Sequence, residues 1–259
     1  MLDVVARSRK AEPATSKAWW RQSLTLFLLF LTLAFLAACG DDASSSTLVE
    51  LASPCKTESE DSCEYGELED SRDGQTYKTV TIGTQTWMAE NLNFKTDSSS
   101  CYDNEESNCI KYGRLYTWAA AIGKSESKCG YDYVCSLPSG NIQGVCPSGW
   151  HLPSDDEWLT LFIAVGSSST AGKVLKSTSD WKDDGNGTDA FGFSALPAGY
   201  RYIYNGAKFS DVSIRTNVWS STEYNRNYAY AIEMGSRSLE ANLGWIVKNN
   251  EASIRCLKD

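Results

Sequence analysis

The chain has 259 residues, of which 42% are hydrophobic and 12% aromatic, so it can form one large domain or two small ones with a substantial core. Its formal net charge of −9 becomes −12 without residues 1–38, which hold five basic and two acidic residues. Such an acidic surface repels polyanions, and we identify no stripe of basic residues, so nucleic acid is excluded as an expected partner.

The N-terminus has the pattern of a bacterial lipoprotein signal peptide. Basic residues precede an apolar run over 23–36, which is shorter than the ~20 residues that span a bilayer. Leu36-Ala37-Ala38-Cys39 then fits a lipobox, in which the Cys39 thiol accepts the lipid. We therefore expect a signal peptide over residues 1–38, lipidation (palmitate included) at Cys39, and export to the outer membrane, with membrane contact through this lipid. An uncleaved anchor helix is the alternative.

Residues 39–63 are polar, acidic and rich in serine, which is typical of a tether between a lipid and a domain. Asp41 and Asp42, close behind Cys39, resemble the surface-export signals of some Gram-negative lipoproteins, although a solvated linker has the same composition. We expect the folded domain to occupy residues 64–259.

Eight cysteines remain besides Cys39, and an even number in an exported chain indicates disulfides. Sequence proximity favours three local bridges, and the last two cysteines then close a loop of about 110 residues, which the chain-entropy model credits with about 4–5 kcal/mol before native strain is subtracted. The expected pairs are Cys55–Cys63, Cys101–Cys109, Cys129–Cys135 and Cys146–Cys256. A metal site is the alternative, which the single histidine and the lack of a Cys-x-x-Cys motif disfavour.

Helix and strand signals alternate along the first part of the domain. Alternating residues over 77–82 and 85–88, separated by Gly83-Thr84, predict a hairpin. Residues 115–122 have helical composition before Gly123. Ser154-Asp155-Asp156-Glu157 is a capping box that begins a helix with apolar residues at helical spacing. A second short helix is expected over 170–176.

After Trp181 the pattern changes to strands, and Asn205-Gly206 is a strong two-residue hairpin turn between two of them. Two helices among many short antiparallel strands indicate an α+β domain. The expected strands are 198–204, 207–211, 218–221, 228–234, 245–247 and 253–257.

Several sequence blocks carry a family resemblance. They are residues 82–92 (IGTQTWMAENL), 112–118 (YGRLYTW), 146–154 (CPSGWHLPS) with Glu157-Trp158, 191–199 (FGFSALPAG), 219–223 (WSSTE) and 254–256 (IRC). In this order they resemble the Fibrobacter succinogenes major paralogous domain over roughly residues 70–259. The resemblance implies a bacterial surface or secreted protein of unknown activity.

The block Gly149–Pro153 leading to Glu157-Trp158 is also similar to formylglycine-generating-type domains, which have the C-type-lectin-like fold. In that fold a helix after such a block lies beside a sheet that the chain's ends close, and a bridge between Cys146 and Cys256 would parallel its long disulfide. By this analogy we expect a C-type-lectin-like α+β domain with short antiparallel strands and two helices, stapled by disulfides.

Catalysis is not expected. His151 is the only histidine, Ser154 caps a helix, and a Gly-x-Ser-x-Gly elbow is absent from the sequence, so a structural role for His151 is favoured over a Ser–His–Asp triad. No acidic pair has a diagnostic glycosidase spacing. Formylglycine-type oxidation needs a cysteine pair near the C-terminus, where this chain has only Cys256.

A weak calcium candidate lies in an acidic, glycine-containing segment, whose oxygens could bind Ca²⁺ although the spacing of an EF-hand is missing. A simple turn is the favoured alternative, and no other metal or cofactor is expected. The candidate ligands are Asp183, Asp184, Asn186 and Asp189.

Tyrosines at every second position of 200–204 share one face of a strand, where sugar rings could stack on them and Arg201 could bind hydroxyl groups. Tyr228 and Tyr230 have the same spacing. The favoured alternative is that these rings fill a core or cover a sheet. The candidate ligand-binding residues are Tyr200, Tyr202, Tyr204 and Arg201, whereas Trp87, Trp118, Trp150 and Trp158 are expected in the core.

The leading hypothesis is a non-enzymatic, lipid-anchored module that binds a ligand outside the cell, with polysaccharide as the candidate ligand. A structural component of the cell surface that contacts other proteins through loops such as 96–109 or 125–144 is the alternative. A hydrolase ranks third.

Overall fold

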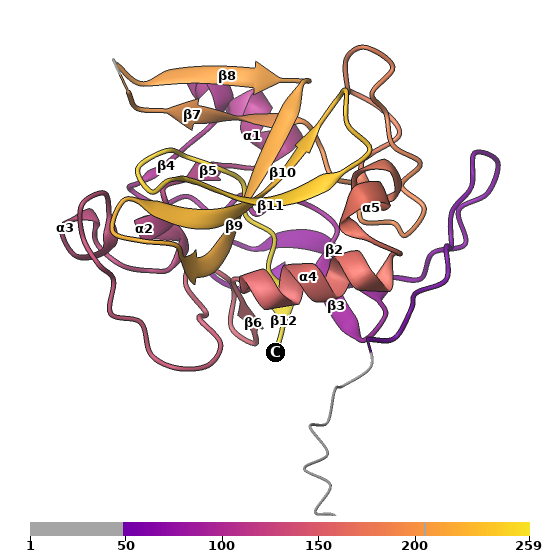
Figure 1. The fold of residues 1–259 in the computed structure, drawn as a ribbon, viewed down its shortest axis with the longest axis horizontal. Coiled ribbons are helices and arrows are strands. Elements are labelled where there is room, and N and C mark those ends of the chain that lie inside the picture. The colour runs from indigo at the N-terminus through magenta and orange to yellow at the C-terminus, as the bar shows by residue number, and fades with distance from the viewer. Residues whose placement is uncertain (1–48, 205) are drawn as a thin grey trace, which may run out of the picture. The chain divides into compact units, whose positions relative to one another are not determined.

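The computed structural model describes residues 49–204 and 206–259, so the predicted signal peptide, Cys39 and the turn residue Asn205 lie outside the described residues. The described chain is a mixed domain of sheets and helices in which strands predominate (Figure 1). None of the helices within residues 49–259 combines the length and hydrophobicity needed to span a membrane.

Two five-stranded sheets form the frame of the domain (Figure 1). In the first sheet the order is β1 (Tyr65–Asp70), β2 (Gln75–Ile82), β3 (Gln85–Met88), β12 (Leu257–Lys258) and β6 (Trp150–His151). In the second the order is β11 (Ala241–Val247), β10 (Tyr228–Gly235), β9 (Arg215–Glu223), β7 (Ala198–Tyr202) and β8 (Lys208–Val212). A short pair, β4 (Ser99–Ser100) with β5 (Leu115–Tyr116), lies apart from them.

Five α-helices and a 3₁₀ turn occur in the described residues, where two helices were expected. The capping box is confirmed: Ser154 and Glu157 bond reciprocally at the start of α4 (Asp155–Ala164). The other helices are η1 (Tyr102–Asn104), α1 (Glu106–Tyr112), α2 (Trp118–Ala121), α3 (Glu126–Cys129) and α5 (Ser168–Leu175).

Three expectations about the elements were wrong. The helix predicted over 115–122 begins only at Trp118, because Leu115 and Tyr116 pair with β4. The strand predicted over 253–257 is reduced to β12, because residues just before it bridge to different partners. The strands are not all antiparallel, since β7 and β9 pair in parallel at Gly199 and Thr216.

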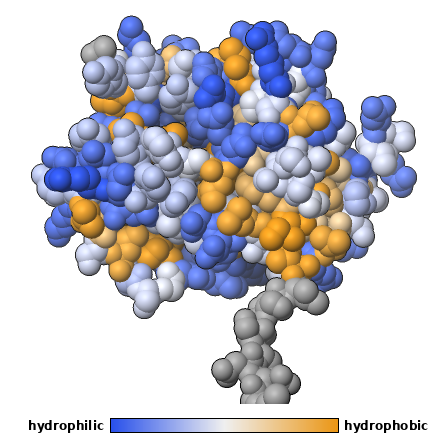
Figure 2. All heavy atoms as spheres, viewed as in Figure 1, coloured by the Kyte–Doolittle hydropathy of each residue, from blue (hydrophilic) through white to orange (hydrophobic). Residues whose placement is uncertain are grey.

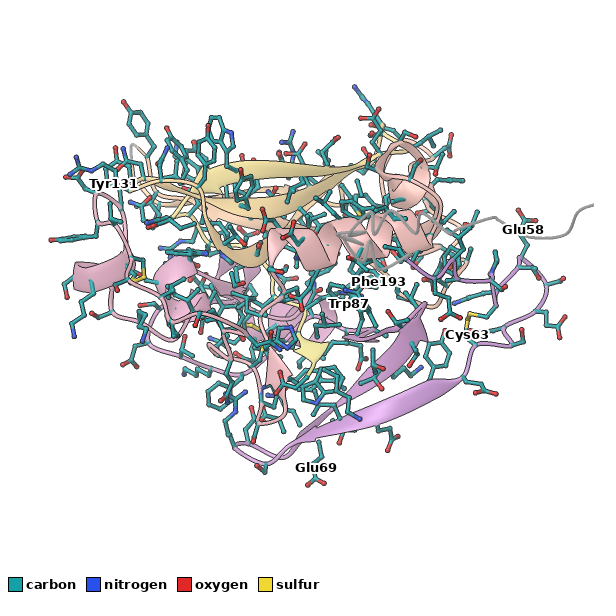
Figure 3. All side chains as sticks on the ribbon, turned by 60° about the horizontal axis from the view of Figure 1, so that its bottom comes forward. Glu58, Cys63, Glu69, Trp87, Tyr131 and Phe193 are labelled. Atoms are coloured by element: carbon teal, nitrogen blue, oxygen red, sulfur yellow. A yellow bond between two sulfur atoms is a disulfide. The ribbon has the colours of Figure 1, made fainter. Side chains whose placement is uncertain are left out.

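The core has two clusters of buried side chains. In one cluster α4 packs against β9, β10 and β11 of the second sheet, and its Trp158 ring lies 4.6 Å from Trp87 of β3. The rings of Trp87 and Phe193 lie 5.9 Å apart (Figure 3). In the other, Trp219 donates its indole N–H to the Tyr116 carbonyl at 2.7 Å. The expectation that Trp87, Trp118, Trp150 and Trp158 lie in the core is confirmed.

Residues 49–63, assigned above to the tether, are instead a strap packed on the domain. The Ala52 N–H donates to the carbonyl of Ala164 at 2.8 Å, and Lys56 Nζ lies 2.8 Å from a carboxylate oxygen of Asp189. Gly83, in the β2–β3 turn, has a φ of 59°, and a Cβ there would lie 2.9 Å from the Glu50 carbonyl oxygen. Glycine therefore lets the strap approach this turn.

Four disulfides staple the domain, and they join the pairs expected from the sequence: Cys55–Cys63, Cys101–Cys109, Cys129–Cys135 and Cys146–Cys256. The first closes the strap, the next two each close a small loop, and the last links residues 110 positions apart.

Arg255, next to the long disulfide, is fully buried. Its guanidinium donates to Asn91 Oδ1 at 2.9 Å and to the carbonyls of Phe193 and Ser194, the latter at 2.7 Å. It also lies 4.4 Å from the centre of the Phe193 ring. Burial lowers the pKa of Arg255 to about 10, which leaves it charged at neutral pH. One cation therefore holds together three chain segments.

We expect Arg255→Lys to lower the free energy of unfolding by about 2–4 kcal/mol, because one ammonium cannot replace the guanidinium contacts and leaves buried carbonyls without donors. Urea unfolding followed by tryptophan fluorescence measures this difference. The control is Arg237→Lys, since Arg237 makes an exposed ion pair with Asp183 and should change stability by less than about 0.5 kcal/mol. Equal effects of the two substitutions would contradict the role given to Arg255.

Candidate functional site

The predicted tyrosines of β7 lie together, but Arg201 does not join them. The rings of Tyr200 and Tyr202 are 6.4 Å apart, and Tyr204 follows the end of the strand with 79% of its surface exposed. Arg201 alternates to the other face, where it forms an ion pair with buried Glu251 and stacks on the Phe209 ring. The structure therefore does not bring Arg201 together with the tyrosines.

Two of these tyrosines line a hollow of about 480 Å³, here named the aromatic cleft. It lies between the β7–β8 hairpin, the β10–β11 pair and the disulfide loop after α3. None of its described lining residues carries a carboxylate, a lysine or an arginine. The lining consists of Tyr131, Tyr202, Ile203, Tyr204, Tyr228, Val247, Asn249 and Asn250.

An aromatic platform of Tyr224, Tyr228, Tyr230 and Trp245 continues the cleft along β10 and β11. Trp245 stacks on Tyr224 with ring centres 5.5 Å apart and an interplanar angle of 7°, and its ring meets Tyr228 edge-on at 4.6 Å. Trp245 is half exposed. Since Tyr228 belongs to both, cleft and platform form one continuous aromatic surface.

The loop closed by Cys129–Cys135 carries Tyr131, which Figure 3 labels. This loop forms one wall of the cleft. The ammonium of Lys248, which is fully buried, bonds the Tyr133 carbonyl at 2.8 Å and pairs with Glu223. The Cys135 N–H also donates to Glu223, at 2.9 Å. At the loop's tip, Asp132 pairs with Arg226 of the β9–β10 turn at 3.0 Å. The loop is thus fixed at three places.

Sequence reasoning identified Tyr202, Tyr204 and Tyr228 from their period of two, but it missed several residues of the site. Two signals were available in the sequence. Tyr131 lies between the closely spaced Cys129 and Cys135, and Trp245 lies in the strand predicted after the one with Tyr228 and Tyr230. Only the pairing register places that tryptophan opposite Tyr230. The missed residues are Tyr131, Tyr224, Trp245, Asn249 and Asn250.

Within the described residues, the oxygens of three residues of the calcium candidate each have separate partners. Asp189 is buried and accepts hydrogen bonds from Ser194 as well as from Lys56. Asp183 pairs with Arg237, and Asn186 accepts the Trp181 N–H. These oxygens therefore satisfy protein donors. Asp184 is exposed.

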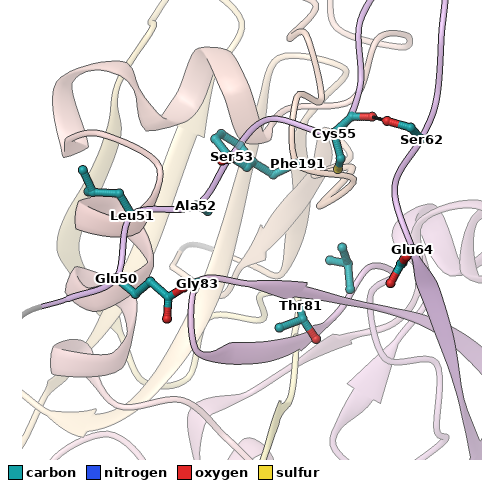
Figure 4. A pocket seen from close by; sticks show the side chains of 11 residues that line it. Glu50, Leu51, Ala52, Ser53, Cys55, Ser62, Glu64, Thr81, Gly83 and Phe191 are labelled. Carbon is teal, nitrogen blue, oxygen red and sulfur yellow. Dashed lines mark hydrogen bonds between the residues drawn. The ribbon is translucent and has the colours of Figure 1, made fainter.

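Two further features of the described chain are a cluster of possible metal ligands and a second hollow. Cys101, Glu106 and Cys109 lie within metal-ligand distance of one another, but the two cysteines share a disulfide and offer no thiolate. A second hollow, of about 450 Å³, lies beneath the strap, where the carboxylates of Glu50 and Glu64 line it beside Gly83 (Figure 4). Its one aromatic lining residue, Phe191, belongs to the core.

His151 has a structural position, as expected at the entry to α4. Its Nε2 lies 2.9 Å from Glu157 and its Nδ1 lies 2.7 Å from Asp259. Burial lowers the pKa of His151, but hydrogen bonds and charge from Glu157 and Asp259 outweigh it, so the pKa is raised above 6.5. Burial raises the pKa of Glu157, but His151 and Ser154 outweigh it and the pKa falls below 4.5.

Residues 80–258 match the family model of the Fibrobacter succinogenes major domain. The chain belongs to this family. The Fibrobacter succinogenes major domain thus begins within β2, ends within β12 and contains every residue of the aromatic cleft, whereas β1 and the strap precede it. No curated protein and no solved structure matches the chain.

The His151–Glu157 pair predicts a defined pH dependence of stability. The raised pKa of His151 stabilises the fold fully below pH 6.5, and this contribution is lost as the pH rises through the folded-state pKa. The lowered pKa of Glu157 stabilises the fold above pH 4.5, and this contribution is lost as the pH falls through its folded-state pKa. Both contributions are therefore present between about pH 4.5 and 6.5.

We expect the loss of unfolding free energy caused by His151→Asn to be larger at pH 5.5 than at pH 9, as measured by urea unfolding. Asp156→Asn, which alters an exposed carboxylate of the same helix, is the control and should show no such pH difference. A His151→Asn effect that is constant with pH would show that the imidazolium charge does not stabilise the fold.

Proposed function

We propose that this chain is an exported lipoprotein whose domain binds an uncharged polysaccharide in the aromatic cleft, without catalysis. The observation that carries the proposal is the composition of the cleft: four tyrosines and two asparagines, with no charged side chain among the lining residues. The platform beside it extends the aromatic surface.

The cleft has the physical properties of a sugar site. Aromatic rings offer flat apolar faces to the C–H faces of pyranoses, and amide groups donate to and accept from hydroxyls. Asn249 and Asn250 supply those amides, and one Asn250 oxygen already accepts the Ile203 N–H at 3.3 Å. A net charge of −12 for the chain after residue 38 disfavours anionic polymers such as polyuronates.

The same lining supports a non-enzymatic role. Glycoside hydrolysis uses two carboxyl groups about 5–5.5 Å or 6.5–9.5 Å apart across the scissile bond. No carboxylate lines the described cleft, and Glu223, behind the disulfide loop, is engaged by Lys248.

The lipobox at Leu36–Cys39 supports the envelope location, with residues 1–38 removed, Cys39 lipidated and the protein held at the outer membrane. The C-type-lectin-like fold belongs to the same proposal. Two curled sheets, flanking helices and a long disulfide ending beside β12 support that fold assignment.

We expect Tyr131→Ala to weaken binding of uncharged β-glucan or xylan fragments at least tenfold, about 1.4 kcal/mol, because a ring that stacks on the sugar is lost. Tyr133→Ala is the matched control: it lies in the same loop and is equally exposed at 48%, but it does not line the cleft. Isothermal titration of residues 47–259, the compact part of the chain, measures both. If no uncharged glycan binds, the carbohydrate proposal is wrong.

The position of the disulfide loop should also matter. We expect Asp132→Asn to weaken glycan binding a few-fold with an unchanged melting temperature, because the exposed pair with Arg226 orients the loop but adds little stability. Asp183→Asn breaks a comparable exposed pair with Arg237, outside the cleft, and should leave affinity unchanged. Glycan titration and thermal unfolding of both variants test this; equal affinities would contradict it.

A further inference from the structure

Three exposed apolar side chains lie on α4 and on the strap that crosses its C-terminal end. Leu159 and Ile163 are one helical turn apart and 40% and 49% exposed. Leu51 of the strap is 69% exposed, and its neighbour Ala52 bonds the carbonyl of Ala164 at the end of this helix. Figure 2 shows hydrophobic residues gathered over α4, with further hydrophobic patches at the lower left and toward the top of the same view. We name Leu51, Leu159 and Ile163 the α4 patch.

We propose that the α4 patch rests on the lipid bilayer to which the chain is anchored. The inference deepens the proposed function, because it depends on lipidation of Cys39. Solvent exposure of aliphatic side chains is unfavourable, and insertion into the interfacial region of a membrane removes them from water.

The length of the chain favours a bilayer as the occupant. Nine residues lie between Cys39 and Val49, where the described strap begins, and the ten Cα–Cα steps across them reach at most about 35 Å when fully extended. The anchor therefore keeps the patch within a short distance of the lipid, at a high effective concentration. The segment 40–48 (GDDASSSTL) has two aspartates and a serine run, so its sequence does not match an apolar surface.

The acidic residues of α4 lie at the end of the helix away from Ile163. Asp155, Asp156 and Glu157 all lie in the first helical turn. A helix that tilts its C-terminal end toward the bilayer immerses Leu159 and Ile163 and leaves these carboxylates in water.

This orientation also directs the aromatic cleft away from the membrane. In Figure 1 the C-terminal end of α4 lies toward the lower right of the domain, whereas α3 and the tip of the β7–β8 hairpin, which flank the cleft, lie at the left and the upper left. A polymer outside the membrane can then reach the cleft while the α4 patch contacts lipid.

The test uses the full chain purified from membranes and placed in vesicles of phosphatidylethanolamine and phosphatidylglycerol that contain a phospholipid with a diazirine on its acyl chain. After illumination, peptide mass spectrometry locates the attached lipid. We expect peptides that contain Leu159, Ile163 or Leu51 to be labelled at least fivefold more than the peptide with Ile110, which is 79% exposed on α1.

Two variants make the result specific. Leu159→Ser/Ile163→Ser should reduce labelling of the α4 peptide at least threefold, and because both side chains are exposed the fold should persist, as unchanged thermal unfolding would show. Ile110→Ser should leave labelling of α4 unchanged. Intact mass separates the lipoprotein proposal from the proposed membrane contact. A lipidated Cys39 with uniform labelling overturns the membrane contact alone. An unmodified Cys39 with residues 1–38 attached overturns both.

Discussion

The fold is organised around the buried guanidinium of Arg255, which has no carboxylate among its described hydrogen-bond partners. The Arg255 guanidinium donates to carbonyl oxygens at 193 and 194 and to the Asn91 amide, and these groups come from segments far apart in sequence. Removing such a charge from water is costly, so the arrangement persists only where every donor finds an acceptor. Next to it, Cys256 closes the 110-residue disulfide, which fixes the same stretch covalently.

The chain on either side of this cation joins the two sheets. Ala252 bridges to Tyr116, Ser253 bridges to Val218, and Leu257 pairs with both Trp87 and His151. A single segment thus contacts β5, β9, β3 and β6 in turn. Because it changes partners at almost every residue, it cannot form one long regular strand. It acts as a connector, and the positions of both sheets depend on it.

Lys248 and Glu251, buried charged residues just before the connector, position the proposed binding surface. Glu251 and Arg201 exchange backbone hydrogen bonds as well as an ion pair, which holds β7 and its tyrosines against the connector. Burial raises the pKa of Glu251, while Ser100 and Arg201 oppose this shift. At the opposite wall of the cleft, Lys248 bonds the Tyr133 carbonyl and so holds the disulfide loop that carries Tyr131. The cleft itself is uncharged, yet its walls are fixed by ion pairs just behind them, an arrangement suited to a neutral ligand that must meet rigid aromatic rings.

Local sequence was sufficient for features whose physics is local. The β2–β3 hairpin, the capped start of α4 and the short disulfides follow from residues a few positions apart, and the family blocks follow from their order along the chain. Tertiary structure decided the rest. Leu115 and Tyr116 have helical composition but pair as a strand with β4, the strap packs on the domain despite its polar sequence, and the oxygens of Asp183, Asn186 and Asp189 serve separate donors. The aromatic surface depends on the β10–β11 register and on one loop, so residues 131, 202, 228 and 245 gather only when long-range pairing brings their strands together.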